Sequence, residues 1–305
     1  MKIGVNILNF GAAATPSVLE RWAMETEGLG YHFVMISDHV AITPDVASRF
    51  PTPFYDPFIV LAWLAGATKK VELGTSVTIL PYRHPLHTAR MAANIDHLSG
   101  GRFLFGVGVG WAQQEFAALG IPFHRRGALT DEYLAVIKQF WTQDIISYSG
   151  KSLMFQDVHT GPRPRRSPHP PIWVGGSSEA AMRRVLRFGD AWHPLRFRVD
   201  WMKSAGLPRL REMADAAGTN IPALCPRIFL RVSSSALDDD QRMAGEGTLD
   251  QIRRDFDGLA AMGAEYVLLD SYAPNPETAR TPELAWKMLE TLAEQIFDLD
   301  GESLR

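Results

Sequence analysis

The chain has 305 residues, of which 46% are hydrophobic, and a formal net charge of −3 at pH 7. This composition is typical of a globular protein with a substantial core, and the nearly balanced charge argues against nucleic acid or an anionic membrane as partner. The single cysteine, Cys225, excludes an intrachain disulfide. The first residues read as a strand rather than a signal peptide, and no apolar run approaches the roughly 20 residues of a membrane span, so we expect a cytoplasmic protein.

Short apolar segments rich in β-branched and aromatic residues predict eight β-strands. They cover residues 2–7, 33–37, 71–77, 103–107, 172–174, 190–193, 228–232 and 266–269. Helical periodicity predicts helices over residues 17–28, 57–68, 86–98, 129–141, 179–188, 201–217, 248–262 and 282–297. This alternation predicts an α/β fold, a (β/α)8 TIM barrel that forms a single domain over residues 1–305. A doubly wound open sheet is the alternative, which is weakened because no Gly-x-Gly-x-x-Gly follows the first strand.

One long excursion interrupts the alternation between Trp141 and Ile172, over about thirty residues rich in Gly, Pro, Ser and Arg. We interpret it as an insertion before strand five, with a short hairpin around Gly150. Three of its arginines form either a basic rim for an anionic ligand or simply solvated charge; they are Arg163, Arg165 and Arg166.

The ends of the predicted strands carry the candidate catalytic residues, because TIM barrels place their chemistry at the carboxyl ends of strands. His39 follows strand two and is a candidate general acid or base, since an unperturbed imidazole titrates near neutral pH. The alternative is a structural histidine bonded to Asp38. Strand six ends in Trp192 and His193, which are either a pocket wall with a reserve catalytic histidine or a core tryptophan with a satisfied histidine.

Two glycine-rich segments predict contact with a ligand. Gly175, Gly176, Ser177 and Ser178 lie between strand five and a helix, where a helix N-terminus and close backbone approach favour a phosphate. The alternative is an empty loop in which Ser178 caps the helix. Glycines also alternate over residues 106–110, so that a flat ring or a phosphate can lie against the backbone, or so that neighbouring strands can pack closely.

Metal-dependent and serine-hydrolase chemistry have little support. No His-x-His follows the first strand, the pair His84 and His87 is weak evidence for a metal, and no Gly-x-Ser-x-Gly is present. We therefore expect no metal site.

Together these motifs resemble the luciferase-like monooxygenase superfamily over nearly the whole chain. The resemblance rests on Ser-Asp-His after strand two, Gly-Thr-Ser-Val in strand three, Gly-Val-Gly-x-Gly after strand four and Gly-Gly-Ser-Ser after strand five. Within the superfamily, residues 106–141 are similar to the branch that uses the deazaflavin coenzyme F420, through Gly110-Trp111-x-x-x-Glu115-Phe116.

The resemblance implies that a flavin or deazaflavin ring lies in the barrel mouth, where Gly108 and Gly110 would contact it. Its phosphate would lie on residues 175–178. Asp38 would bond near the ring, His39 would face the substrate, and the Ser76–Val77 peptide bond would be cis, although no proline is involved. Proteins of this kind usually form homodimers.

The chain departs from the superfamily's sugar-phosphate dehydrogenases, which carry a glutamate directly after the third glycine of the strand-four motif, where Trp111 stands here. With Trp111 and Trp192 in the pocket, we expect a small, largely apolar or planar substrate. The leading hypothesis is an F420-dependent oxidoreductase that transfers a hydride. The alternatives are an FMN-dependent monooxygenase and a protein that binds a flavin or deazaflavin without catalysis.

Overall fold

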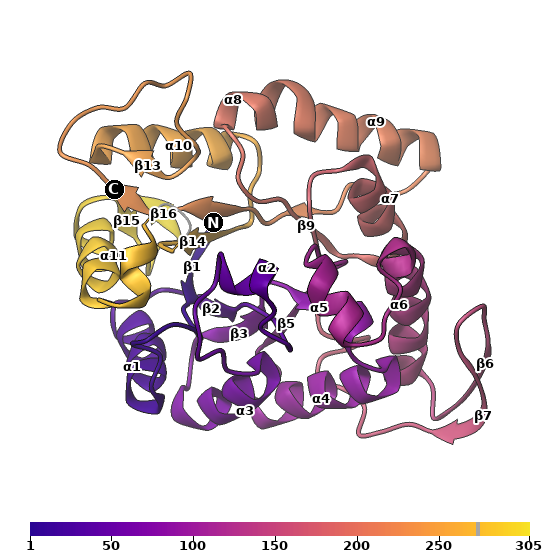
Figure 1. Cartoon of the computed structure of the whole chain (residues 1–305). Helices are drawn as coiled ribbons and strands as arrows, with labels where there is room; N and C mark the ends of the chain where they lie inside the picture. Colours follow the sequence, from indigo (N-terminus) through magenta and orange to yellow (C-terminus); the bar gives the residue numbers. More distant parts are fainter. Residues whose placement is uncertain (273–274) are drawn as a thin grey trace.

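The computed structural model describes residues 1–272 and 275–305, and it forms the predicted α/β barrel (Figure 1). The main sheet runs in the order β10-β9-β8-β5-β3-β2-β1-β14-β11, with every pairing parallel. Its strands are β1 (Lys2–Ile7), β2 (Phe33–Ile36), β3 (Glu72–Thr75), β5 (Phe103–Gly108), β8 (Ile172–Gly175), β9 (Ala191–His193), β10 (Ala223–Leu224), β11 (Arg227–Phe229) and β14 (Tyr266–Asp270).

The seventh barrel strand is divided into two short strands, β10 and β11, which connect the two ends of the sheet. β10 pairs with β9 and β11 pairs with β14, while only Cys225 and Pro226 separate β10 from β11 in the chain. Pro226 has no N–H to donate to a ladder, which explains the interruption. The predicted strand over residues 228–232 therefore begins five residues too late. The predicted strand over 71–77 is also divided, since β3 ends at Thr75 and the chain pairs again with β5 as β4 (Thr78–Ile79).

Helices surround the sheet, and the eight predicted ones are present to within a few residues at most ends, whereas α2 and α5 were not predicted (Figure 1). They are α1 (Pro16–Gly28), α2 (Pro44–Ala47), α3 (Pro57–Ala67), α4 (Pro85–Leu98), α5 (Gln113–Ala118), α6 (Arg126–Thr142), α7 (Glu179–Phe188), α8 (Val199–Trp201), α9 (Leu207–Ala217), α10 (Leu249–Ala261) and α11 (Glu283–Gln295). A π-helical turn over Met202–Gly206 joins α8 to α9. No helix in the described ranges is both long and apolar enough to span a membrane.

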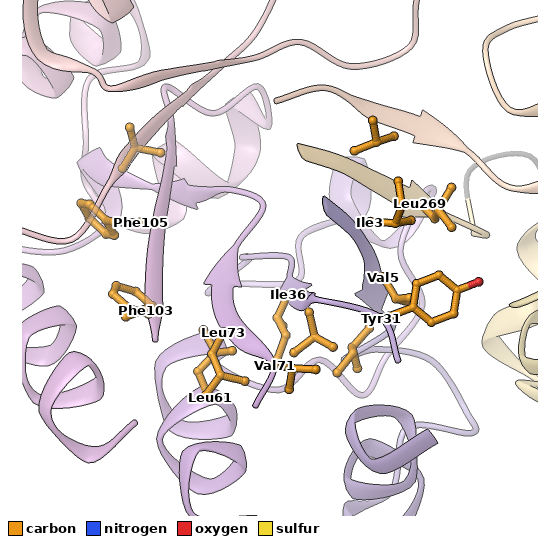
Figure 2. Close-up of a cluster of buried hydrophobic side chains, with 14 of the residues drawn as sticks. Ile3, Val5, Tyr31, Ile36, Leu61, Val71, Leu73, Phe103, Phe105 and Leu269 are labelled. Carbon is orange, nitrogen blue, oxygen red and sulfur yellow. The ribbon is translucent and has the colours of Figure 1, made fainter. Parts of the chain in front are cut away.

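The core has two main layers, beside a small third cluster of Ile79, Tyr82 and Phe116. The larger one fills the space between the strands and the helices; Figure 2 shows part of it, including Ile3, Leu73, Phe103 and Leu269. The smaller one fills the barrel interior, where Phe33 of β2 and Trp173 of β8 meet with ring centroids 5.8 Å apart although their strands are not neighbours. Gly4 makes room there, because a Cβ at this position would lie 2.4 Å from the Phe33 ring.

The insertion before strand five is present. It contains the predicted hairpin, formed by β6 (Ile145–Ser149) and β7 (Met154–His159), which projects from the edge of the barrel in Figure 1. Further along, Arg166 bonds Glu72, the first residue of β3, and the backbone of Gly101. Arg166 thus closes the amino-terminal end of the barrel, so it does not form a basic rim at the mouth.

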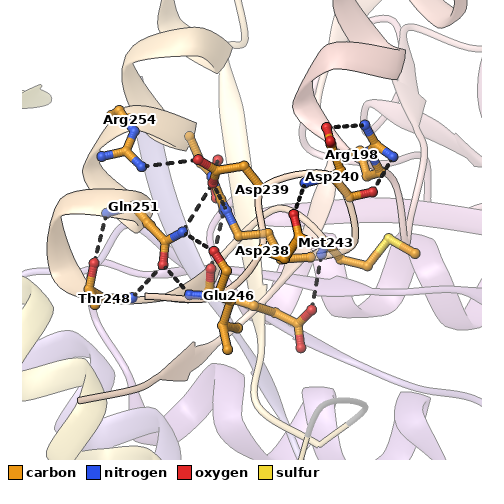
Figure 3. Close-up of polar contacts among 12 residues, drawn as sticks. Arg198, Asp238, Asp239, Asp240, Met243, Glu246, Thr248, Gln251 and Arg254 are labelled. Atoms are coloured by element: carbon orange, nitrogen blue, oxygen red, sulfur yellow. Dashed lines mark hydrogen bonds and ion pairs between the residues drawn. The ribbon is translucent and has the colours of Figure 1, made fainter. Parts of the chain in front are cut away.

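The loop after the seventh strand is tied to α10 and α8 by a polar network (Figure 3). It begins after β12 (Arg231–Val232) and ends at β13 (Glu246–Gly247). Gln251 donates to Leu237 O and Asp239, and Arg242 makes two hydrogen bonds to Asp255. Arg198 bonds the backbone of Asp240, which holds this loop against the start of α8.

Candidate active site

A cleft of about 350 Å³ opens at the carboxyl ends of the strands, where the fold predicts the chemistry. Its walls come from the loops after seven of the eight barrel strands or from the strand ends themselves. The lining residues are Ser37, Asp38, His39, Arg49, Phe50, Ser76, Val77, Ile79, Gly108, Val109, Gly110, Trp111, Gly175, Gly176, Leu195, Arg196, Arg227 and Asp270. Most of the predicted site residues therefore share one cavity.

The alternating glycines face the segment that follows β3. A Cβ on Gly106 would lie 1.8 Å from Thr75 O, and one on Gly108 would lie 2.5 Å from Val77 Cγ2. A Cβ on Gly110 would lie 2.7 Å from Ile79 Cγ2. Close packing of neighbouring strands, one of the two interpretations, thus explains why these positions are glycine. The backbone of Gly108 and Gly110 still lines the cleft.

The Ser76–Val77 peptide bond is cis, as the family resemblance implies. The side chain of Val77 lies over Gly108 and Gly175, since a Cβ on Gly175 would be 3.1 Å from Val77 Cγ1. Two hydrogen bonds from Arg227 hold Ser76 in place: Nη1 donates to the Ser76 carbonyl oxygen (2.7 Å) and to its Oγ (3.0 Å). Asp270 in turn accepts from the Arg227 guanidinium at 2.8 and 3.1 Å.

His193 lies beneath the cleft, fully buried, and not on its wall. Its Nδ1 bonds the carbonyl oxygen of Cys225, which can only accept, so Nδ1 carries the proton and Nε2 accepts from Ser76 Oγ (2.9 Å). Burial, together with the nearby charge of Arg227 and against the opposing effect of the Cys225 hydrogen bond, lowers the pKa of His193 to about 4. The imidazole is therefore neutral and has no free nitrogen, so the expectation of a reserve catalytic residue is not supported by its contacts.

Trp192, predicted to lie in the substrate pocket, does not line the cleft either. Its side chain is fully buried, and its Nε1 donates to Gly176 O at 2.8 Å. The strand-six pair thus matches the alternative of a core tryptophan with a satisfied histidine. Successive side chains of a strand point to opposite faces of the sheet, and both faces of β9 are covered, so Trp192 and His193 are each buried before the chain turns at Pro194.

Asp38 is buried at the cleft wall and is already fully engaged. Arg83 donates to both carboxylate oxygens at 2.7 and 2.9 Å, and the backbone N–H of Ile79 donates at 2.9 Å. Arg83 also bonds Asp56, the N-cap of α3. Asp38 therefore anchors the segment after the cis bond.

His39 is paired with a carboxylate that the sequence analysis did not single out as a site residue. His39 Nδ1 donates to Glu115 Oε2 at 2.6 Å, and Tyr82 OH donates to the same oxygen at 2.9 Å. The other oxygen accepts from the N–H groups of Val40 (2.6 Å) and Ala41 (3.0 Å). Burial alone would raise the pKa of Glu115, but these hydrogen bonds hold it below its usual value. Glu115 is thus an ionised carboxylate with all four acceptor positions filled.

At the predicted phosphate cradle the structure shows the Ser178 cap that the alternative of an empty loop also expects. Gly176 adopts a φ of +106°, which side chains rarely allow, and Ser178 Oγ caps α7 by accepting from Ala181 N at 3.3 Å. The first N–H groups of a helix have no partner within it, so those of the α7 N-terminus point outward. Ser177 lines a second cavity of about 520 Å³ that adjoins the cleft at Arg196 and extends to Arg198, Trp201, Ser204 and Met243.

Trp111 stands at the mouth beside His39, where it is 37% exposed. Its ring is nearly perpendicular to that of His39, with centroids 5.7 Å apart, and the Arg49 guanidinium lies 4.4 Å from the Trp111 ring centroid. Phe50 completes this aromatic corner, 5.3 Å from His39. The predicted planar surface is therefore present, although it comes from Trp111 and Phe50 rather than from Trp192.

Several cleft residues were missed from the sequence. Asp270 directly follows predicted strand eight, so reading that strand end would have found it, whereas Arg227 precedes the predicted seventh strand, which was placed too late. Arg49 and Arg196 lie in loops with no motif around them. In the part of the chain that the structure describes, no cluster of three His, Cys, Asp or Glu side chains could hold a metal ion.

Curated relatives match different lengths of the chain. An uncharacterized protein of Mycobacterium tuberculosis is 30% identical over 204 residues, which are 63% of this chain and 71% of the relative. The pyrimidine monooxygenase RutA of Allorhizobium ampelinum is 36% identical over 140 residues, covering 44% of this chain and 37% of the relative. An FMNH2-dependent dimethylsulfone monooxygenase of Pseudomonas putida is 35% identical over 133 residues, covering 43% and 36%.

Solved structures share the fold over nearly the whole chain. An F420-dependent secondary alcohol dehydrogenase superposes with a TM-score of 0.78 at 16% identity, covering 96% of this chain and 97% of that one. The oxygenating constituent of a 3,6-diketocamphane monooxygenase of Pseudomonas putida, in complex with FMN, gives a TM-score of 0.75 at 15% identity with the same coverage. The family model described as luciferase-like monooxygenase matches residues 1–287, and the chain therefore belongs to the luciferase-like monooxygenase family.

Proposed function

We propose that the protein is an F420-dependent oxidoreductase that transfers a hydride between the deazaflavin and a small organic substrate, with His39 as the catalytic proton donor or acceptor. The observation that carries this proposal is the buried His39–Glu115 pair on the wall of the cleft. When bound, the cofactor supplies the hydride chemistry, and the chain must supply orientation and one proton.

Glu115 positions His39 for that role. Because both the Tyr82 hydroxyl and two backbone N–H groups donate to Glu115, the carboxylate can only accept from His39 Nδ1. This fixes the tautomer of the neutral ring and stabilises the charged ring, and it leaves Nε2 to exchange a proton with a substrate oxygen. The same arrangement orients catalytic histidines in other enzymes.

The residues present fit a flavin-type cofactor. A planar ring would lie in the cleft against the wall that Val77 and the backbone of Gly108 to Gly110 form together, and its phosphate would be held by Gly176, Ser177 and the N-terminus of α7. Asp38 and Arg227 would act one step further out, since they bond the segment around Ser76 that faces the ring.

The second cavity supports F420 over FMN. FMN ends at its phosphate, whereas F420 continues into an anionic tail. The cavity of about 520 Å³ starts at Ser177 and extends to Arg198 and Ser204, so it offers room beyond the phosphate position, although both side chains already donate to Asp200. The FMN alternative, a monooxygenase, is supported by the relatives, because the dimethylsulfone monooxygenase is described as FMNH2-dependent.

Titration of the purified protein with F420 and, separately, with FMN tests the proposal through the change in ring fluorescence. Tight F420 binding with weak FMN binding is the expected result, and the reverse would favour the monooxygenase. A panel of carbonyl and imine acceptors, followed by F420 absorbance, then separates an enzyme from a protein that only binds the cofactor. We also infer a homodimer and a cytoplasmic location, which sedimentation and fractionation check.

A further inference from the structure

In the described part of the chain, the side chains that line the cleft include two arginines that are not paired with a carboxylate. Both carboxylates on its wall, Asp38 and Asp270, are already paired with arginines, as described above. Arg49 and Arg196 also line the cleft, and within residues 1–272 and 275–305 neither guanidinium forms a hydrogen bond or an ion pair with a carboxylate. Two positive groups in one concave wall favour an anion between them.

Arg49 is held in place although it is exposed. Its guanidinium stacks on Trp111, and its backbone oxygen accepts from the hydroxyl of Tyr272. Trp111 in turn contacts His39 edge to face. The Arg49 side chain therefore stands beside the catalytic histidine rather than sampling open solvent.

Arg196 has two further unusual features. Its φ is +54°, a left-handed conformation that few residues with a side chain adopt and that concentrates at functional sites. Partial burial lowers the pKa of its guanidinium, and the positive charges of Arg227 and Arg49 lower it further against the opposing effect of Asp270. Arg196 thus lies close enough to both arginines to be repelled by them, and a bound anion would relieve that repulsion.

We propose that Arg49 and Arg196 form an anion subsite and that the substrate is a small planar compound carrying a carboxylate. This inference rests on the proposed function, because it assigns the carboxylate to the molecule on which His39 acts. The planar part would stack on Trp111 and Phe50, and the guanidinium groups would hold the carboxylate through paired hydrogen bonds. The substrate must be small, since the cleft of about 350 Å³ also holds the cofactor ring.

The phosphate of the cofactor is the other anion that could lie near Arg196, which borders both cavities. Arg49 favours the substrate: it comes from the loop after β2, on the side of His39 and Trp111. The phosphate cradle instead belongs to the loop after β8, and Arg49 does not line the cavity that begins at Ser177.

Calorimetric titration with benzoate and with benzamide tests the subsite, because the two probes share a shape and differ in charge. The wild-type protein, as purified and loaded with F420, is expected to bind benzoate more tightly by about ten- to a hundredfold. Arg49→Met and Arg196→Met should each remove most of this preference. Arg183→Met, which changes an exposed arginine of α7 outside both cavities, should retain it.

Equal affinity of the wild-type protein for both probes, or no binding of either, would overturn the proposal. The same variants are then titrated with F420 and FMN. A loss of cofactor affinity of tenfold or more, with the benzoate preference intact, would assign the arginines to the cofactor and would also overturn it. The proposed function is tested separately, by the cofactor titration of the wild-type protein. A protein that binds neither F420 nor FMN would refute the proposed function, whatever its preference between benzoate and benzamide.

Discussion

Acidification should destabilise the protein through His193, which is buried in its neutral form. The imidazole is fully buried and its pKa is about 4 in the folded chain, against 6.5 for an ordinary histidine. Because the unfolded chain binds the extra proton between these two values, stability is complete above pH 6.5 and falls as the pH drops toward 4. A difference of about 2.5 pH units corresponds to about 3 kcal/mol, of which about 2 kcal/mol is lost by about pH 5.

Urea unfolding followed by tryptophan fluorescence at about pH 7.5, 6 and 5 measures this loss. The variant His193→Asn removes the titrating group but keeps an amide that can donate to the Cys225 carbonyl. It should be less stable than the wild type at neutral pH, since the bond from Ser76 is weakened, and its stability should depend much less on pH. The matched control is His159→Asn, at an exposed histidine of β7, which should leave the wild-type pH dependence unchanged.

The comparison between variants is decisive because several carboxylates also contribute at lower pH. The pKa of Glu115, for example, is held below its ordinary value of 4.5, so its stabilising effect disappears only at more acidic pH. If the wild type and His193→Asn lose stability in parallel over the same pH range, the buried neutral histidine is not the cause and the assignment of its tautomer loses its support.

Three further predictions concern the site. His39→Ala should lower turnover by about 10²- to 10⁴-fold with less than about a threefold change in F420 affinity, and equal losses in both would contradict a catalytic role. Glu115→Gln should lower turnover by about ten- to a hundredfold and shift the His39 tautomer in ¹⁵N NMR spectra; an unchanged tautomer would refute the positioning role. Gly108→Ala should cost about 1–3 kcal/mol of unfolding free energy and weaken cofactor binding, because its Cβ would lie 2.5 Å from Val77, whereas Gly66→Ala meets no atom and should not destabilise.

The fold could be predicted because its signals are local. Apolar runs and helical periodicity located seven of the eight barrel strands at nearly correct positions. The length and composition of the segment between Trp141 and Ile172 predicted the insertion. The seventh strand was displaced because Ala223–Leu224 is too short to give a pattern and Pro226 interrupts the segment. Pairing with β9 and β14, not local propensity, makes these residues a strand.

The site was predictable to the extent that its residues end strands. His39, Ser76 and Gly176 were found in this way, and each lines the cleft. Glu115 could not be assigned a partner from the sequence, because 76 residues separate it from His39 and only the barrel closure brings them together. Trp192 and His193 were predicted to face the pocket, but both are buried outside the cleft lining, since a strand's last residues can point into the core as readily as into the mouth.

The alternating glycines of β5 and the loop after it divide the cleft into a wall that tolerates little change and a wall that can be altered. Gly108 and Gly110 line the cleft and have no space for a Cβ, so that wall can scarcely be varied by substitution. The opposite wall is built from loop side chains, among them Arg49, Trp111 and Arg196, which are exposed and replaceable. Attempts to change the substrate range should therefore randomise these loop positions and leave the glycines intact.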